Sequence, residues 1–150
     1  MAFLAVALML HSCAADNAMR KGEKFLAIGE YHDAAEQFKK AYTKTPTKER
    51  QLRGQRALKM AHCYRHISST QKAISAYRNA LRDNVATLDD RLDYARLLLK
   101  NGEYKRALTE FELLKDSMPN NVLVRNGLLS AKMAPKWKEQ GSDYTVKKMT

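Results

Sequence analysis

The sequence is poor in cysteine, with only Cys13 and Cys63 among its 150 residues. Because Cys13 lies in a separate N-terminal segment, Cys63 is left as a lone thiol, and we expect no intramolecular disulfide. A lone cysteine of this kind is most simply a small core residue. The cysteine count therefore argues against a disulfide-stapled scaffold and says little about the redox compartment.

The sequence also lacks a long apolar run, because the N-terminal one covers only residues 1–10. A membrane-spanning helix needs roughly 20 apolar residues, whereas about ten match the hydrophobic region of a secretory signal peptide. The segment Leu10-His11-Ser12-Cys13 follows, although no Lys or Arg precedes the run as a signal peptide usually requires. An ordinary N-terminal helix with an incidental cysteine remains the alternative.

Catalytic motifs are missing as well. The chain has no glycine-rich phosphate loop, no paired-carboxylate pattern and no plausible nucleophile–base set. Residues 69–72 read Ser-Thr-Gln-Lys, but the companion motifs of penicillin-binding enzymes do not occur, so we regard this match as chance. His62 and His66 stand four residues apart, a spacing that can hold a metal, yet no third ligand follows. We predict a non-catalytic protein without metal or cofactor.

Acidic residues are few: the sequence has 16 Asp and Glu but 27 Lys and Arg, which gives a net charge of +11. Such a balance favours acidic partners, among them nucleic acid, anionic lipid headgroups, acidic glycans and acidic protein segments. Most aromatic residues, however, fall on core positions of the repeat described next rather than among exposed basic residues. We therefore do not expect nucleic-acid binding.

A pattern with a period near 34 residues occurs three times. Two copies are nearly superimposable, and the third, between them, is weaker. The copies are Gly29-Glu30-Tyr31-x-x-Ala34-Ala35-x-x-Phe38-x-x-Ala41 with Pro46, Ala73-Ile74-x-x-Tyr77-x-x-Ala80-Leu81, and Gly102-Glu103-Tyr104-x-x-Ala107-Leu108-x-x-Phe111-x-x-Leu114 with Pro119. A fixed period of this length is typical of a solenoid of helical hairpins.

The repeat predicts an all-α, right-handed solenoid of seven helices. We expect a signal peptide over 1–12 and a solenoid domain over 13–133, with repeats at 15–48, 54–87 and 88–121 and a capping helix at 122–133. Ala134 and Pro135 should end that helix, because proline disrupts a helix interior, and a linker over 134–150 should follow. Residues 49–53 should lengthen the first helix of repeat two.

Local signals refine this register. Small residues recur where two helices of a hairpin should cross closely: Gly22, Ala61 and Ala95 on the first helices and Ala34, Ala73 and Ala107 on the second. Thr87 with Asp90, and Asn121, read as helix N-caps. In repeat two, Ser68 replaces the expected glycine and Val85 the expected proline. A non-glycine residue in the left-handed region costs about 1 kcal/mol, so another turn geometry is open to residues 66–69.

The residues of the repeated pattern resemble the tetratricopeptide repeat (TPR). Repeats one and three match it well, and repeat two matches it in part. A closer resemblance, to the N-terminal region of large Bacteroidetes outer-membrane lipoproteins, is visible in residues 18–24, 57–64 and 127–137. In that family a lipidated cysteine precedes TPRs, a β-propeller and an OmpA-like peptidoglycan-binding domain, and some members serve type IX secretion. Residues 141–146 resemble the lead-in to the propeller. Since neither later domain is present, peptidoglycan binding does not transfer to this chain.

The lipoprotein resemblance implies a location for the protein. The segment Leu10-His11-Ser12-Cys13 is similar to a lipobox, in which cleavage before the cysteine leaves a lipid-modified N-terminus. The resemblance thus implies lipidation of Cys13 and a lipid-anchored protein on the periplasmic face of the outer membrane.

The TPR resemblance also implies a concave groove lined by the first helix of each hairpin. Its partner-binding residues would be Leu58, His62, Arg65, Leu92, Arg96, Leu99 and Lys100, joined by Asp16, Met19, Glu23, Leu26, Gln55, His66 and Asp89. Apolar side chains beside cations would suit a helix or extended peptide that carries apolar anchors and carboxylates. Met19 and Glu23 occupy two positions of the carboxylate clamp found in chaperone-binding TPRs, so that clamp does not carry over.

A basic stripe forms a second candidate surface. It recurs near every third residue of the lengthened helix, with Glu49 as the single acidic residue nearby, and comprises Lys48, Arg50, Arg53, Arg56 and Lys59. It could meet lipid headgroups or an acidic partner, or be an ordinary solvated face.

Three functions stay open from the sequence. The first is a protein-interaction scaffold in an envelope or secretion complex. The second is a passive spacer for domains absent here, and the third a charge-driven binder of anionic glycan or nucleic acid.

Overall fold

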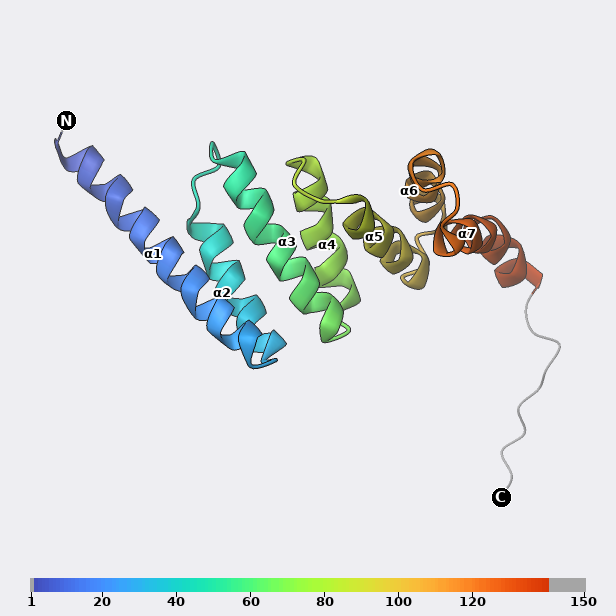
Figure 1. Ribbon diagram of the computed structural model, residues 1–150, viewed down its shortest axis with the longest axis horizontal. Coiled ribbons are helices and arrows are strands. Elements are labelled where there is room, and N and C mark those ends of the chain that lie inside the picture. The colour runs from blue at the N-terminus through green and yellow to red at the C-terminus, as the bar shows by residue number, and fades with distance from the viewer. Residues whose placement is uncertain (1, 141–150) are drawn as a thin grey trace, which may run out of the picture.

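The computed structural model describes the backbone of residues 2–140 and the side chains of residues 13–140, and all regular elements in that range are helices. They are α1 (Ala2–Ala27), α2 (Tyr31–Lys44), α3 (Arg50–His66), α4 (Thr70–Arg82), α5 (Leu88–Lys100), α6 (Tyr104–Ser117) and α7 (Val122–Gln140). Figure 1 shows them stacked in chain order along the long axis. The predicted all-α solenoid of three hairpins and a seventh helix is confirmed.

The first helix is longer than the repeat requires. It begins at Ala2 and runs without a break through Cys13 to Ala27. No helix within residues 2–140 combines the length and the apolar character needed to cross a bilayer. Neither observation tests cleavage before Cys13, which stays a prediction.

The last helix is also longer than predicted, and the expected end at Pro135 is wrong. Helix α7 continues through Pro135 to Gln140. A proline removes one helix hydrogen bond and crowds the preceding turn, but it need not end the helix. Pro135 lines a cavity with Gly102 and Tyr104, at the α5–α6 turn. The predicted linker therefore includes helical residues 134–140, and residues 141–150 lie outside the described part.

The hairpin turns keep one geometry in all three repeats, including the irregular second. Gly29 and Gly102 have φ angles of 78° and 79°, and Ser68 adopts the same left-handed region at 57°. The amide of Ser68 donates to the carbonyl of Arg65, and the next amide donates to the carbonyl of Tyr64, as happens at the two glycine turns. Ser68 thus adopts the left-handed conformation and the backbone hydrogen bonds of the two glycines.

Small residues allow close packing of large aromatic rings. Ala34, Ala73 and Ala107 are fully buried, as are Phe38 and Phe111 in the second helices. A Cβ atom on Gly22 would lie 2.5 Å from the ring of Phe38. A Cβ on Gly127 would overlap the ring of Phe111. Helix α7 therefore covers the last hairpin by packing a glycine against a phenylalanine ring, as α1 does in the first hairpin.

Two helix starts are capped as predicted. The hydroxyl of Thr87 accepts from the amide of Asp90, whose carboxylate accepts from the amide of Thr87, which completes a capping box. The side chain of Asn121 accepts from the amides of Leu123 and Val124.

We predict that Ser68→Gly raises the free energy of unfolding by about 0.5 kcal/mol. The variant relieves a left-handed strain of about 1 kcal/mol, and the added flexibility of the unfolded chain offsets part of that gain. Urea unfolding followed by circular dichroism measures the change. Ser68→Ala, which keeps the strain, is the control and should show no gain; equal stability of the two variants would contradict the prediction.

Candidate binding groove

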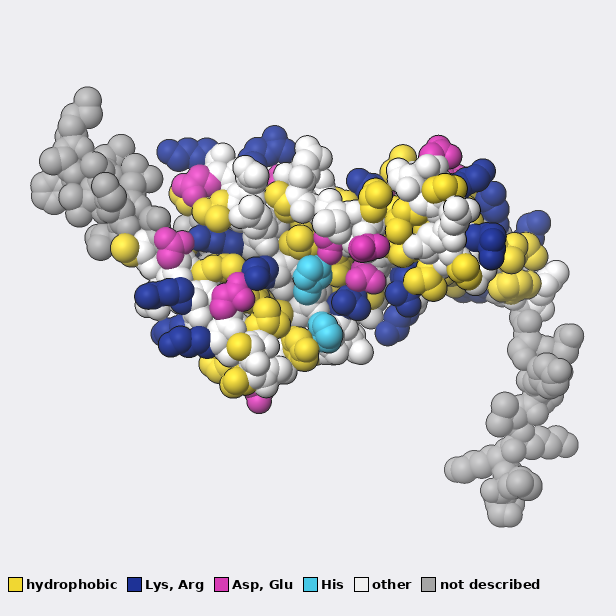
Figure 2. Space-filling model, viewed as in Figure 1, with side chains coloured by type: hydrophobic (Ala, Val, Ile, Leu, Met, Phe, Trp, Pro, Cys, Tyr) yellow, Lys and Arg dark blue, Asp and Glu magenta, His cyan; other side chains and the backbone are white. Residues whose placement is uncertain are grey.

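A cavity of about 480 Å³ lies between α1 and α3. Its walls are mainly apolar side chains, with polar and charged groups among them: Asp16, Met19, Leu26, Leu52, Gln55, Arg56, Leu58, Lys59 and His62. Figure 2 shows hydrophobic side chains beside basic ones and histidines on this face of the molecule. The combination of an apolar interior and charged groups is typical of a site for an amphipathic ligand.

The structure brings together the predicted groove residues of repeats one and two. Leu58 and His62 line the cavity, as do Asp16, Met19 and Leu26 on α1. All five were expected on the concave face, and the structure places them around one cavity.

The predicted groove residues of repeat three do not reach the cavity. Leu92 is only 5% exposed and belongs to the hydrophobic core, so its assignment to the groove surface is wrong. Leu99 is half-buried and packs against the same core. Arg96 and Lys100 are exposed, but like Arg65 they do not line the cavity.

The predicted cations are in part neutralised by the protein itself. Asp93 lies between two of them, 3.2 Å from Nε of Arg65 and 3.6 Å from Nη1 of Arg96. The acidic side chain comes from α5, the helix that follows the hairpin of Arg65. Two cations share one carboxylate here, so this part of the surface keeps a net positive charge.

The two histidines serve different contacts. Nε2 of His62 lies 2.6 Å from a carboxylate oxygen of Asp90, and the ring of His66 stacks on that of Tyr31 at 4.1 Å. Among the described side chains, no group of three or more metal-ligating residues gathers. His62 therefore ties α3 to the capped start of α5.

Asp90 has a pKa that depends on this contact. Burial acts to raise the pKa of the carboxyl, but the hydrogen bond from His62 and those from Thr87 outweigh it. The net result is a pKa below the ordinary value. The ionised form of Asp90 consequently stabilises the fold.

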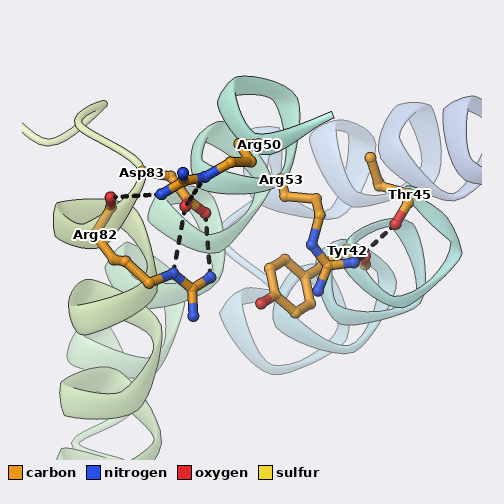
Figure 3. A network of polar contacts seen from close by, with 6 residues as sticks. All are labelled: Tyr42, Thr45, Arg50, Arg53, Arg82 and Asp83. Atoms are coloured by element: carbon orange, nitrogen blue, oxygen red, sulfur yellow. Dashed lines mark hydrogen bonds and ion pairs between the residues drawn. The ribbon is translucent and has the colours of Figure 1, made fainter. Parts of the chain in front are cut away.

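The basic stripe is not a free surface, and its interpretation as a solvated or lipid-facing row is wrong for Arg56. That side chain is 3% exposed and donates to the carbonyl of Ala41, to the hydroxyl of Thr45 and, at 2.7 Å, to the carboxylate of Asp16. Arg53 donates to the carbonyls of Tyr42 and Thr45 (Figure 3). Both guanidinium groups therefore satisfy the carbonyl end of α2.

Two further members of the stripe pair with acids from distant helices, whereas Lys48 is exposed. Nζ of Lys59 lies 2.7 Å from Glu23 on α1, and Nε of Arg50 lies 3.4 Å from Asp83. The sequence places only Glu49 near the stripe, so these partners are not visible locally. The i, i+3 spacing of the basic residues gives no sign of them, because they belong to other helices.

The two cysteines occupy different environments. Cys63 is fully buried, as expected for a small core residue, and burial raises the pKa of its thiol to about 11. Cys13 is exposed on α1.

Comparison with known proteins supports the fold. No protein-family model matches the sequence, and no curated protein matches it either. Solved structures do match. One is the C-terminal TPR-containing domain of a putative FK506-binding protein from Plasmodium falciparum. It has a TM-score of 0.69 at 17% identity, and the match covers 87% of this chain and 94% of that one.

Two further structures are similar. The first TPR of Spaghetti (RPAP3), bound to the HSP90 peptide SRMEEVD, has a TM-score of 0.61 at 19% identity, covering 84% of this chain and 96% of that one. The TPR2B domain of yeast Sti1, in a complex with pHsp70, has a TM-score of 0.58 at 14% identity, covering 82% and 99%. The chain has a TPR fold.

We predict that the stabilising effect of Asp90 disappears in acid. Because the pKa of this carboxyl is lower in the folded state, its contribution is present above the unfolded value of about 4 and is lost as pH falls through the folded value. Urea unfolding of wild type and Asp90→Asn from neutral pH to pH 3 measures it. The difference in stability between the two proteins should shrink as pH falls, and a constant difference would contradict the prediction.

Proposed function

We propose that the protein is a non-catalytic protein-interaction module that binds a segment of a partner protein in the groove between α1 and α3. The observation that carries this proposal is the cavity of about 480 Å³, open between two first helices of the solenoid and walled by Met19, Leu26, Leu52 and Leu58. Side chains of this kind bind the apolar face of a helix or of an extended peptide.

The similar structures support such a role. Two of the solved TPR structures carry a bound partner, an HSP90 peptide in one case and pHsp70 in the other. The ligand of this chain need not have their chemistry. Met19 belongs to the apolar wall and Glu23 pairs with Lys59, so neither side chain serves here as a clamp for a terminal carboxylate.

The charges around the groove suggest which segment it binds. Lys59 and His62 lie at the cavity, where they pair with Glu23 and Asp90. Arg65, Arg96 and Lys100 lie farther along α3 and α5, and Arg65 and Arg96 share the carboxylate of Asp93. A partner segment with a bulky apolar anchor followed by acidic residues matches this order of groups. The apolar anchor supplies most of the affinity, and the acidic residues orient the segment.

The location that we propose is the periplasmic face of an outer membrane, with a lipid anchor on Cys13 and a role in an envelope or secretion complex. The lipobox-like residues 10–13 and the exposure of Cys13 on α1 support it. Mass spectrometry of the mature N-terminus tests this location: a lipid-modified Cys13 at the N-terminus is the expected result, and an unmodified Met1 would contradict it. A passive spacer would have the same anchor but no ligand for the groove.

We predict that Leu58→Glu abolishes partner binding. Peptides selected from a displayed library against the wild-type protein serve as ligands, and isothermal titration calorimetry measures their affinity. A carboxylate in the apolar wall should weaken binding at least tenfold, because burial of an unpaired charge is costly.

Leu113→Glu, on an exposed site of α6 outside the groove, is the matched control and should bind as wild type does. Substitution of Arg65, Arg96 and Lys100 by glutamate should selectively weaken the binding of peptides that carry acidic residues. Unchanged affinity of Leu58→Glu, or failure to select any peptide, would overturn the proposal and favour the spacer.

A further inference from the structure

We propose that the ends of α2, α3 and α4 form a second site, which binds a phosphate group. A cavity of about 400 Å³ lies there, apart from the groove, and its lining comprises Tyr42, Thr47, Arg50, Arg53, Arg82 and Asp83. Figure 3 shows the three arginines around Asp83 and Tyr42. The site does not depend on the proposed function of the groove.

The charges of this cavity do not balance. The lining holds three guanidinium groups but only one carboxylate, that of Asp83, so it carries a net charge of +2. The side chain of Asp83 is only 2% exposed, whereas those of Arg50 and Arg82 are 66% and 56% exposed. The carboxylate of Asp83 is thus enclosed by the protein, whereas the guanidinium groups of Arg50 and Arg82 face the solvent and can contact an entering ligand.

The arginines are held in place before any ligand arrives. Asp83 accepts from Nε of Arg50 at 3.4 Å and from Nε and Nη2 of Arg82 at 3.3 and 3.2 Å. Arg53 donates from Nη1 to the carbonyls of Tyr42 and Thr45 at 3.1 and 2.7 Å. Its guanidinium lies over the ring of Tyr42, 4.2 Å from the centroid. Such fixed groups lose little conformational entropy on binding.

Each of these arginines also keeps a free donor. Among the described residues, Nη1 of Arg50 and Nη2 of Arg53 have no hydrogen-bond acceptor. Arg82 bonds to Asp83 through two N–H groups and to the side chain of Tyr42 through a third, which leaves two of its five N–H groups. A phosphate group offers several oxygens in different directions and can accept from all three, whereas a carboxylate offers two oxygens in one plane. The donor set therefore favours a phosphate monoester over a carboxylate.

The irregular second repeat creates this site. Residues 49–53 extend α3 at its start and contribute Arg50 and Arg53. Gly54 lets that start approach the end of α4, since a Cβ there would lie 2.9 Å from side-chain atoms of Asp83 and Val85. Val85 stands where the other repeats have proline. Two departures of repeat two, the extended start of α3 and Val85, thus meet at one place, whereas Ser68 lies in the turn between α3 and α4.

The phosphate could belong to a soluble phosphate monoester or to a phospholipid headgroup, which share this chemistry. The first arm of the test titrates phenyl phosphate, with acetate at matched ionic strength, into wild type and variants by calorimetry. The second arm measures cosedimentation with phosphatidylcholine vesicles that contain phosphatidic acid.

Arg82→Gln and Arg50→Gln are the test variants, and Arg125→Gln, an exposed arginine on α7, is the matched control. Circular dichroism checks that each variant is folded, and either test variant suffices if the other is not. We expect wild type and Arg125→Gln to bind phosphate with equal affinity and more tightly than acetate, and the test variants to lose at least tenfold.

The two arms identify the source of the phosphate. Arginine-dependent binding of phenyl phosphate alone identifies a soluble ligand, and arginine-dependent binding of vesicles identifies the headgroup; both support the site. No binding in either arm, or equal binding by wild type and the test variants, would overturn it.

Discussion

The structure depends on one buried cation more than on any other polar group. Arg56 reaches from α3 between the first two helices, where its guanidinium donates to the carbonyl of Ala41 and the hydroxyl of Thr45 on one side and to Asp16 on the other. A charge that is 3% exposed is tolerated only when it is well paired, because burial of an unpaired ion costs several kcal/mol. The pairing requires α1, α2 and α3 to keep their relative positions.

Both candidate sites follow from this junction. On one side of α3, Arg56, Leu58 and His62 form a wall of the groove opposite Met19 and its neighbours on α1. On the other side, Arg53 binds the end of α2 and leaves Arg50 and Arg82 to enclose Asp83. A single lengthened helix thus organises an apolar groove and a cationic cavity. The second repeat, which departs most from the pattern, carries most of the chemistry.

The sequence predicted the periodic features well. The register located every hairpin, the capping box of Thr87 and the buried rings, because these depend on residues close together in the chain. The sequence could not predict the ion pairs of the basic stripe, since the acids that pair with Arg56, Lys59 and Arg50 come from other helices. Leu92 was placed on the groove by its position in the repeat, but the packing of α5 buries it. The local helix propensity of Pro135 placed the end of α7 too early, since the helix continues to Gln140.

Arg56 holds the first three helices together, and hydrogen–deuterium exchange of Arg56→Met is the measurement that tests this role. Lys59→Met is the matched control, because Lys59 lies on the same helix and also pairs with a carboxylate of α1, yet its side chain is 41% exposed. In Arg56→Met, amides of α1, of the end of α2 and of the start of α3 should exchange faster, while those of α5–α7 should be unchanged. Lys59→Met should exchange as wild type does. If Arg56→Met shows no faster exchange in α1–α3 than Lys59→Met, Arg56 does not hold these helices together.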